Sequence, residues 1–214
     1  MQVSIAGLGH RFGEGPWLFR NLSAVLEPGH VYALTGPSGS GKSTLLGMLA
    51  GWEAPAEGAI HKDRDGRVGW VFQNPHGVPR RTAVDHIVFP MLAAGEHPVR
   101  AEAQAMEMLE RFGLASIAER QFRSLSGGEA QRLMLARGMA ADPALLLVDE
   151  PTAQLDPRTA DEVNAALSRI ASARVTVVVA THDERTREAC TDHLNLRDFQ
   201  PAPRPPARRD GGSE

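Results

Sequence analysis

The sequence predicts an α/β fold with a mostly parallel sheet. Residues 144–150, "ALLLVDE", and residues 175–181, "VTVVVAT", are continuous apolar runs of strand length, as expected for strands covered on both faces. Residues 156–171 between them predict a helix, which makes a strand-helix-strand unit. Earlier, the apolar run 30–36 leads through a glycine-rich loop into a helix that we expect to end at Gly51.

The first third of the chain predicts antiparallel strands. Residues 3–8 and 22–29 have strand patterns bounded by turns. Residues 58–73, "GAIHKDRDGRVGWVFQ", predict a hairpin that turns at Asp65 and Gly66. We therefore expect a partly antiparallel N-terminal region.

The middle of the chain predicts helices. In residues 100–113, apolar side chains recur at helical spacing and Gly113 supplies the stop. The later helix has its own start signals, because Asp156 is suited to the N-cap and Pro157 to the first helical position.

Composition limits the classes of function. The 214 residues carry 23 Lys and Arg against 26 Asp and Glu, and the basic residues are scattered, so no nucleic-acid partner is expected. A single cysteine, Cys190, predicts a reducing, cytoplasmic setting. No stretch reaches the roughly 20 apolar residues of a membrane helix. We expect the Pro-, Arg- and Gly-rich residues 199–214 to be disordered.

"GPSGSGKS", at 36–43, fits the phosphate-binding pattern G-x-x-x-x-G-K-[ST]. Glycines let backbone N–H groups surround phosphate oxygens, and the following helix directs its positive end at them. Lys42 would reach the β- and γ-phosphates, and the Ser43 hydroxyl would bind Mg²⁺. A glycine-rich turn before an ordinary helix is the structural alternative. The expected phosphate-binding residues are Gly36, Pro37, Ser38, Gly39, Ser40, Gly41, Lys42, Ser43 and Thr44.

Two acids and a histidine follow the apolar strands. Asp149 and Glu150 come at the carboxyl end of one strand, where open α/β sheets bind their ligands. We expect Asp149 to hold Mg²⁺ and Glu150 to deprotonate the attacking water. His182 follows the last strand and could contact the γ-phosphate. The alternatives are two solvated acids at a strand end and a structural histidine.

A second glycine-rich stretch, "LSGGE", occupies residues 125–129. Ser126 and Glu129 fit a capping box ahead of a helix. Gly127 and Gly128 at a helix start also fit an anion site, because no β-carbon blocks close approach. The residues themselves allow either interpretation, or both.

Taken together, these motifs strongly resemble the ATP-binding cassette of ABC transporters. They occur in the family's order over about residues 1–198: "GPSGSGKST", "FQ" at 72–73, "LSGGE", "LLLVDEPT" at 145–152, "LD" at 155–156 and "THD" at 181–183. The resemblance implies one domain with a P-loop NTPase core, an N-terminal antiparallel β-subdomain and an inserted α-helical subdomain at about 76–137.

The resemblance also implies a head-to-tail dimer of identical or different cassettes around two ATP molecules. Ser126, Gly127 and Gly128 would bind the γ-phosphate of the partner's ATP. Gln73 would contact Mg²⁺ and relay the nucleotide state to a membrane permease. Phe12, or less well Trp17, would stack on adenine. Asp156 would lie in a loop at the dimer interface.

We therefore expect a cytoplasmic ATPase that lies on the inner face of the cell membrane through its permease. The chain is similar to the lipoprotein-releasing and macrolide-export branch, and it also resembles vitamin and metal-ion uptake cassettes. Gly77 and Arg81 stand where the family commonly has apolar residues, in the stretch that faces the transporter. The alternatives are a soluble ABC protein acting on nucleic acid or translation, and a non-hydrolysing regulator.

Overall fold

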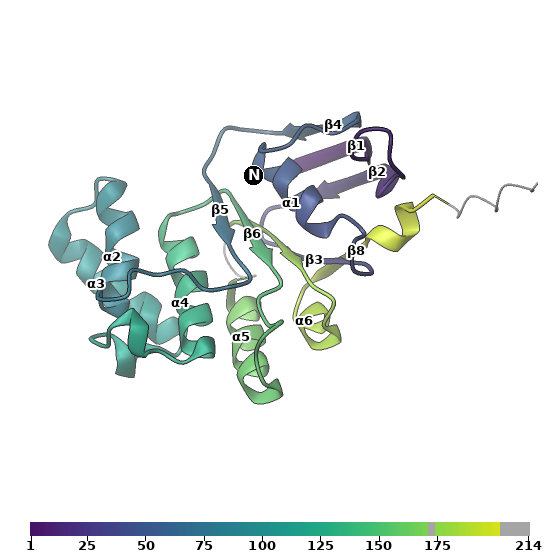
Figure 1. The fold of residues 1–214 in the computed structure, drawn as a ribbon. Coiled ribbons are helices and arrows are strands. Elements are labelled where there is room, and N and C mark those ends of the chain that lie inside the picture. The colour runs from purple at the N-terminus through teal and green to yellow at the C-terminus, as the bar shows by residue number, and fades with distance from the viewer. Residues whose placement is uncertain (171–173, 202–214) are drawn as a thin grey trace, which may run out of the picture.

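Two sheets and three groups of helices make up the described part of the protein (Figure 1). The structure is a computed structural model, and it describes residues 1–170 and 174–201. The larger sheet has five strands in the order β5-β6-β7-β3-β8, and its pairings are parallel. Its strands are β3 (Val31–Thr35), β5 (Val68–Val71), β6 (Leu145–Asp149), β7 (Thr176–Ala180) and β8 (Asp192–Asn195). The predicted α/β fold with a mostly parallel sheet is confirmed.

The smaller sheet is antiparallel and has the order β2-β1-β4. It contains β1 (Val3–His10), β2 (Phe19–Leu26) and β4 (Glu57–Lys62). The partly antiparallel N-terminal region is therefore as predicted.

The hairpin predicted for residues 58–73 is wrong. β4 pairs with β1, whereas β5 leaves the small sheet and pairs with β6 in the large one. The segment between β4 and β5 contacts the residue just before β6. A β-carbon on Gly66 would lie 2.5 Å from Ala144 Cβ, and the Ala144 amide donates to Arg67 O. An Asp-Gly pair favours a turn but does not determine which strand β5 pairs with. The buried apolar residues of β6 determine that pairing.

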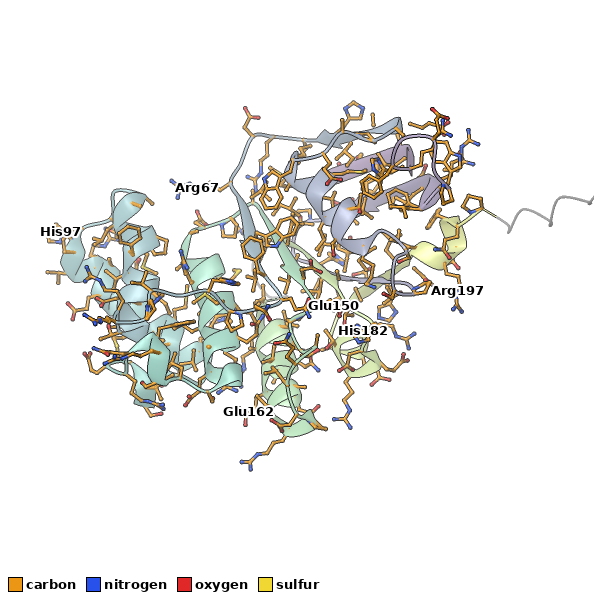
Figure 2. All side chains as sticks on the ribbon, viewed as in Figure 1. Arg67, His97, Glu150, Glu162, His182 and Arg197 are labelled. Atoms are coloured by element: carbon orange, nitrogen blue, oxygen red, sulfur yellow. The ribbon has the colours of Figure 1, made fainter. Side chains whose placement is uncertain are left out.

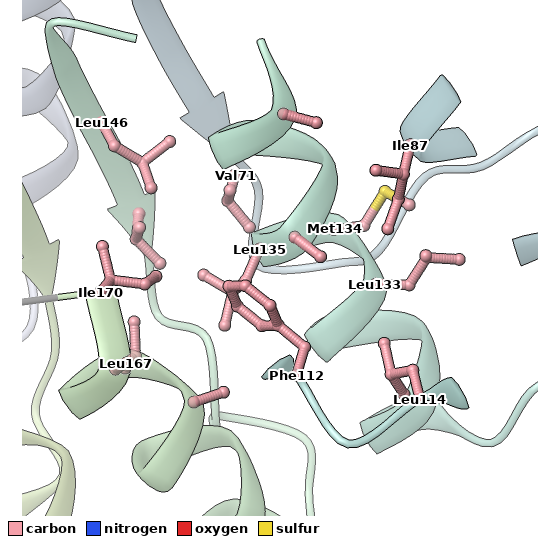
Figure 3. Packing of buried hydrophobic residues seen from close by; sticks show 14 of the residues in the cluster. Val71, Ile87, Phe112, Leu114, Leu133, Met134, Leu135, Leu146, Leu167 and Ile170 are labelled. Atoms are coloured by element: carbon pink, nitrogen blue, oxygen red, sulfur yellow. The ribbon is translucent and has the colours of Figure 1, made fainter. Parts of the chain in front are cut away.

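Helices cover both faces of the parallel sheet. α1 (Lys42–Ala50) lies on the side of the antiparallel sheet, and α5 (Pro157–Ile170) and α6 (Glu184–Glu188) lie on the opposite side (Figure 1). Leu145 and Leu147 of β6 belong to the core shared with α1 and the small sheet. The alternate residue Leu146 belongs to the core shared with α4 and α5 (Figure 3). This alternation follows from the two-residue period of a strand.

Three further helices lie beyond the β5 edge of the sheet: α2 (Ala83–Ala93), α3 (Pro98–Arg111) and α4 (Gly127–Ala140) (Figure 1). Short 3-10 turns at Ala115–Ile117 and Phe122–Ser124 connect α3 to α4. Leu109 of α3 and Leu133 of α4 are fully buried in the core on that side. The predicted stop at Gly113 follows α3 with φ 71°, a conformation that glycine adopts easily.

The end of the described chain is a 3-10 turn at Leu196–Phe199, whose Phe199 packs against the core next to α1. Disorder was expected for residues 199–214, but Phe199 belongs to this turn, so the expected start of the tail is too early. The rest of that tail, residues 202–214, lies outside the described residues. The division into one domain at 1–198, a helical subdomain and a tail stays a prediction. No helix in the described ranges has the length and apolar character that crossing a membrane requires.

Candidate functional site

The carboxyl ends of three neighbouring strands bring most of the predicted site together. β3 leads into the glycine loop 36–41, β6 ends at Asp149 and is followed by Glu150, and β7 is followed by Thr181 and His182. Because the three strands are parallel, these ends meet at one edge of the sheet. Figure 2 shows Glu150 and His182 close together at this edge.

The glycine loop has a backbone conformation that glycine adopts more easily than other residues. Gly36 and Gly41 have φ of 150° and 94°, and a β-carbon would lie 2.6 Å from Ser40 Oγ at the first and 3.0 Å from the Phe19 ring at the second. α1 begins after Gly41 without a side-chain cap and without an acidic residue in its first turn. Its free N–H groups and its positive dipole end are therefore available to a phosphate.

Lys42 lies at the start of α1 and turns back over the loop. Its Nζ atom donates to Gly36 O at 3.2 Å and lies 3.6 Å from Oε1 of Glu150. Both side chains are largely buried. A phosphate in the loop would offer Lys42 a stronger, doubly charged partner in the same place.

Ser43, in the first turn of α1, faces Asp149, the last residue of β6. Ser43 Oγ donates to Asp149 Oδ1 at 3.3 Å. Burial, and to a smaller extent the neighbouring Glu150 carboxylate, raise the pKa of Asp149, against opposing effects of Ser43 and Lys42. A buried carboxylate is costly unless a positive charge compensates it. A hydroxyl and a carboxylate together are the oxygen ligands that a hard divalent cation prefers.

Three polar groups of two residues, His182 and Lys42, lie next to the Glu150 carboxylate. Its Oε2 atom accepts from the backbone amide of His182 at 3.3 Å and lies 2.8 Å from the Nδ1 atom of the same residue. Its Oε1 atom faces Lys42. Glu150 has φ 45°, unusual for a residue other than glycine, and its amide donates to Ala180 O at 2.9 Å. The backbone turn thus directs the carboxylate into the site rather than along the strand.

Lys42, Ser43 and Glu150 line a cavity of about 340 Å³, which is in the size range of small-molecule sites. Asp149 and His182 contact these residues but are not part of the lining. Phe12 also lines it and is 62% exposed. Its ring makes an edge contact with His10, with the ring centroids 4.9 Å apart, and most of the side chain stays open to a ligand. Trp17 is engaged instead, because the guanidinium groups of Arg11 and Arg20 lie 5.0 and 4.6 Å from its ring. Leu18 also lines the cavity, although no motif marks it in the sequence. The lining residues are Phe12, Leu18, Ser38, Gly39, Gly41, Lys42, Ser43, Thr44 and Glu150.

Ser126, Gly127 and Gly128 are not among the residues around this cavity. They form the start of α4, and the predicted capping box is present: Ser126 Oγ accepts from the Glu129 amide and Glu129 Oε2 accepts from the Ser126 amide. Gly128 also has a packing role, because a β-carbon there would lie 2.0 Å from Thr159 Cγ2 of α5. Gln73 is exposed after β5 and does not line the cavity.

Asp156 is the N-cap of α5, as predicted. Its Oδ1 atom accepts from the amides of Arg158 and Thr159 at 3.1 and 3.2 Å. Gly77, one of the two departures from the usual family pattern, is explained by Phe122, whose ring would lie 2.4 Å from a β-carbon at this position.

A model of the ABC transporter family matches residues 19–153, more than half of the chain. The chain belongs to the ABC transporter family. The cassette binds and hydrolyses ATP as the nucleotide-binding subunit of a membrane transporter.

Individual relatives of this cassette agree with the family assignment. It is 39% identical over 211 residues to the lipoprotein-releasing system ATP-binding protein LolD of Maricaulis maris, covering 91% of this chain and 92% of that protein. It is 34% identical over 197 residues to the LolD of Alcanivorax borkumensis, covering 85% and 86%.

Solved ABC cassettes share its fold. A metal-chelate type ABC transporter in an inward-facing conformation has a TM-score of 0.77 at 30% identity, covering 91% of this chain and 79% of that one. A dimeric cassette in a post-hydrolysis state, bound to ADP and Pi, has a TM-score of 0.74 at 26% identity, covering 92% and 95%.

Proposed function

We propose that this ABC cassette binds ATP in the loop at residues 36–44 and hydrolyses it with Glu150 as the general base. The observation that carries the proposal is the position of the Glu150 carboxylate between Lys42 and His182 at the edge of the cavity. Once Lys42 turns to the phosphates, Oε1 of Glu150 is free to accept a proton from water, while His182 keeps the carboxylate in place. His182 would also contact the γ-phosphate.

Adenine would stack on Phe12, whose side chain is largely exposed, and the loop amides would bind the phosphates. The pair Ser43 and Asp149 fits Mg²⁺, and Gln73 would join them when the nucleotide is present. A bound Mg²⁺ would neutralise part of the phosphate charge. In the chain itself, the Ser43 hydroxyl holds the Asp149 carboxylate in position for this task.

A second copy of the cassette would complete the site. The start of α4 lies outside the cavity of its own chain, and Ser126 and Gly127 are exposed there, so these two residues and the adjacent Gly128 would bind the ATP of a partner. The dimeric cassette with ADP and Pi supports this arrangement.

The membrane partner would be a permease of the lipoprotein-releasing kind, since the LolD relatives are ATP-binding proteins of lipoprotein-releasing systems. The cassette would then sit on the cytoplasmic face of the membrane through that permease. A mostly apolar cavity of about 450 Å³ beside α2 offers a surface for it. Phe89 at its edge is 71% exposed. The cavity is lined by Val78, Arg81, Asp85, His86, Val88, Phe89, Leu92 and Arg137.

The test is purification of the tagged cassette from detergent-solubilised membranes of its own host. A membrane protein should co-purify and change the ATPase rate. Phe89→Asp should abolish its capture, because a charge would enter the apolar contact. Val99→Asp is the matched control, since Val99 on α3 is 70% exposed and lies outside that cavity. Capture that survives Phe89→Asp would contradict this surface.

The alternative of a soluble ABC protein acting on nucleic acid gains no support from the comparisons, in which the relatives are transporter cassettes. ATPase activity stimulated by RNA or DNA in the absence of any membrane protein would favour it.

A further inference from the structure

Two side chains of α4 bind the backbone on either side of Gln73. Gln131 Nε2 donates to Phe72 O at 3.4 Å, and Arg137 Nη1 donates to His76 O at 3.3 Å. The two acceptors flank Gln73, and the two donors come from one helix. The helix that starts at Ser126 therefore contacts the Gln73 segment at two separate points.

This helix is well placed to hold the segment. Gln131 is 1% exposed, and its neighbours along α4 are buried as well. Figure 3 shows Leu135 of α4 beside Val71, the last residue of β5, and a β-carbon on Gly138 would lie 3.3 Å from Val71 Cγ2. α4 and the end of β5 are therefore in direct contact, and a shift of α4 acts on the backbone that follows β5.

We propose that Gln131 and Arg137 are positioning residues that fix the Gln73 segment to α4, so that a partner's ATP at Ser126 acts on Gln73 of the same chain. The inference rests on the proposed function, in which Ser126 binds the partner's ATP and Gln73 contacts Mg²⁺ beside the ATP of its own chain. Each of the two hydrogen bonds removes freedom from one end of the segment, and together they leave Gln73 to move only with the helix.

A spin label on Asn74→Cys reports the mobility of the segment. Asn74 is exposed and adjoins Gln73. Cys190 will not compete for the label, because burial of its thiol raises its pKa to about 12. In the nucleotide-free protein, Gln131→Met with Arg137→Met should raise the mobile fraction of the spectrum at least about twofold. Identical spectra before and after these substitutions would overturn the proposal.

Three variants guard against a change in folding. Arg137→Met alone alters an exposed position and should raise the mobile fraction in part, while Arg137→Lys, which keeps a donor, should restore it. Arg132→Met is the matched control on α4, because Arg132 is buried and pairs with Glu162 rather than with the Gln73 segment. Equal mobilisation by Arg132→Met would show a general loosening of the helix and would contradict the specific role.

A mixed dimer tests the transmission of the signal. The labelled chain carries Lys42→Ala, so the ATP that contacts it is held by an unlabelled Glu150→Gln partner and reaches it at Ser126. ATP should lower the mobile fraction of the label, and Gln131→Met with Arg137→Met in the labelled chain should abolish that response. An equal response with and without these substitutions would overturn the inference. If no ATP-dependent dimer forms, the proposed dimer fails instead, and the nucleotide-free spectra still decide the role of the two residues.

Discussion

The Nδ1 atom of His182 lies 2.8 Å from Oε2 of Glu150, although the two residues are 32 positions apart in the chain. The contact joins the ends of β6 and β7, which are adjacent in the sheet. It orients the carboxylate that we propose as the general base, while Lys42 faces its other oxygen. Three motifs far apart in the sequence thus meet at one carboxylate.

Glu150→Gln should lower the ATP hydrolysis rate by about 10²- to 10⁴-fold, because glutamine cannot accept the proton from water. ATP binding should remain, and ATP should hold the variant as a dimer on size-exclusion chromatography. Glu184→Gln serves as the control, since Glu184 is an exposed acid paired with Arg187 on α6. A wild-type rate in Glu150→Gln would exclude Glu150 as the base.

Lys42→Ala should weaken ATP binding by roughly 10- to 100-fold, the effect of losing a hydrogen bond to a charged group. The measurement is equilibrium binding of a fluorescent ATP analogue to the isolated cassette. Lys62→Ala on the exposed end of β4 should leave the affinity unchanged. An unaltered affinity in Lys42→Ala would contradict the phosphate contact.

Mixing the Lys42→Ala chain with a Ser126→Arg chain should restore ATPase activity that neither homodimer has. In the mixed dimer one composite site carries both substitutions and the other carries none. An equal mixture should recover roughly a quarter of the wild-type rate, because half of the dimers are mixed and each has one intact site. A mixture as inactive as the two homodimers would count against shared sites, unless neither site hydrolyses ATP without the other.

Asp149→Asn should abolish Mg²⁺-dependent hydrolysis and yet stabilise the nucleotide-free cassette. Burial raises the pKa of Asp149, so the folded chain binds more protons than the unfolded one, and stability falls as pH rises from the ordinary aspartate pKa through the raised one. Asparagine removes this unfavourable ionisation. We expect the melting temperature at neutral pH to rise by a few degrees.

The pH dependence supplies the control for Asp149→Asn. The gain should vanish below pH ~4, where Asp149 is protonated in both states. A variant that melts lower than the wild type at neutral pH would show that the Ser43 hydrogen bond outweighs the burial of the charge.

Gly128→Ala should destabilise the cassette by about 1–3 kcal/mol, because the new methyl group would overlap Thr159 Cγ2. Adding Thr159→Ser removes that methyl group and keeps the hydroxyl that donates to Asp156. The double variant should regain its stability in urea unfolding. Stability that is not regained would place the strain elsewhere.

ATPase activity separates the two roles of Gly128. If the glycine also approaches a partner's γ-phosphate, the Gly128→Ala, Thr159→Ser protein will be stable but inactive. A double variant that regains both stability and activity would leave the glycine a packing role alone.

Much of this protein follows from the sequence by itself. The apolar runs at 144–150 and 175–181, the cap at Asp156 and the capping box at Ser126 and Glu129 are encoded within a few residues, and the structure confirms them. The sequence also predicts the phosphate loop, because the chemistry of this motif depends on the local backbone and on residue type.

Only the tertiary structure decided which distant segments meet. The alternation of apolar residues shows that β5 has buried positions but not that it pairs with β6 rather than β4. No spacing predicts that Phe122 covers Gly77, that Thr159 abuts Gly128, or that Gln131 holds the carbonyl of Phe72. A sequence pattern specifies which face of an element is buried, whereas the partner on that face is selected by the packing of the whole chain.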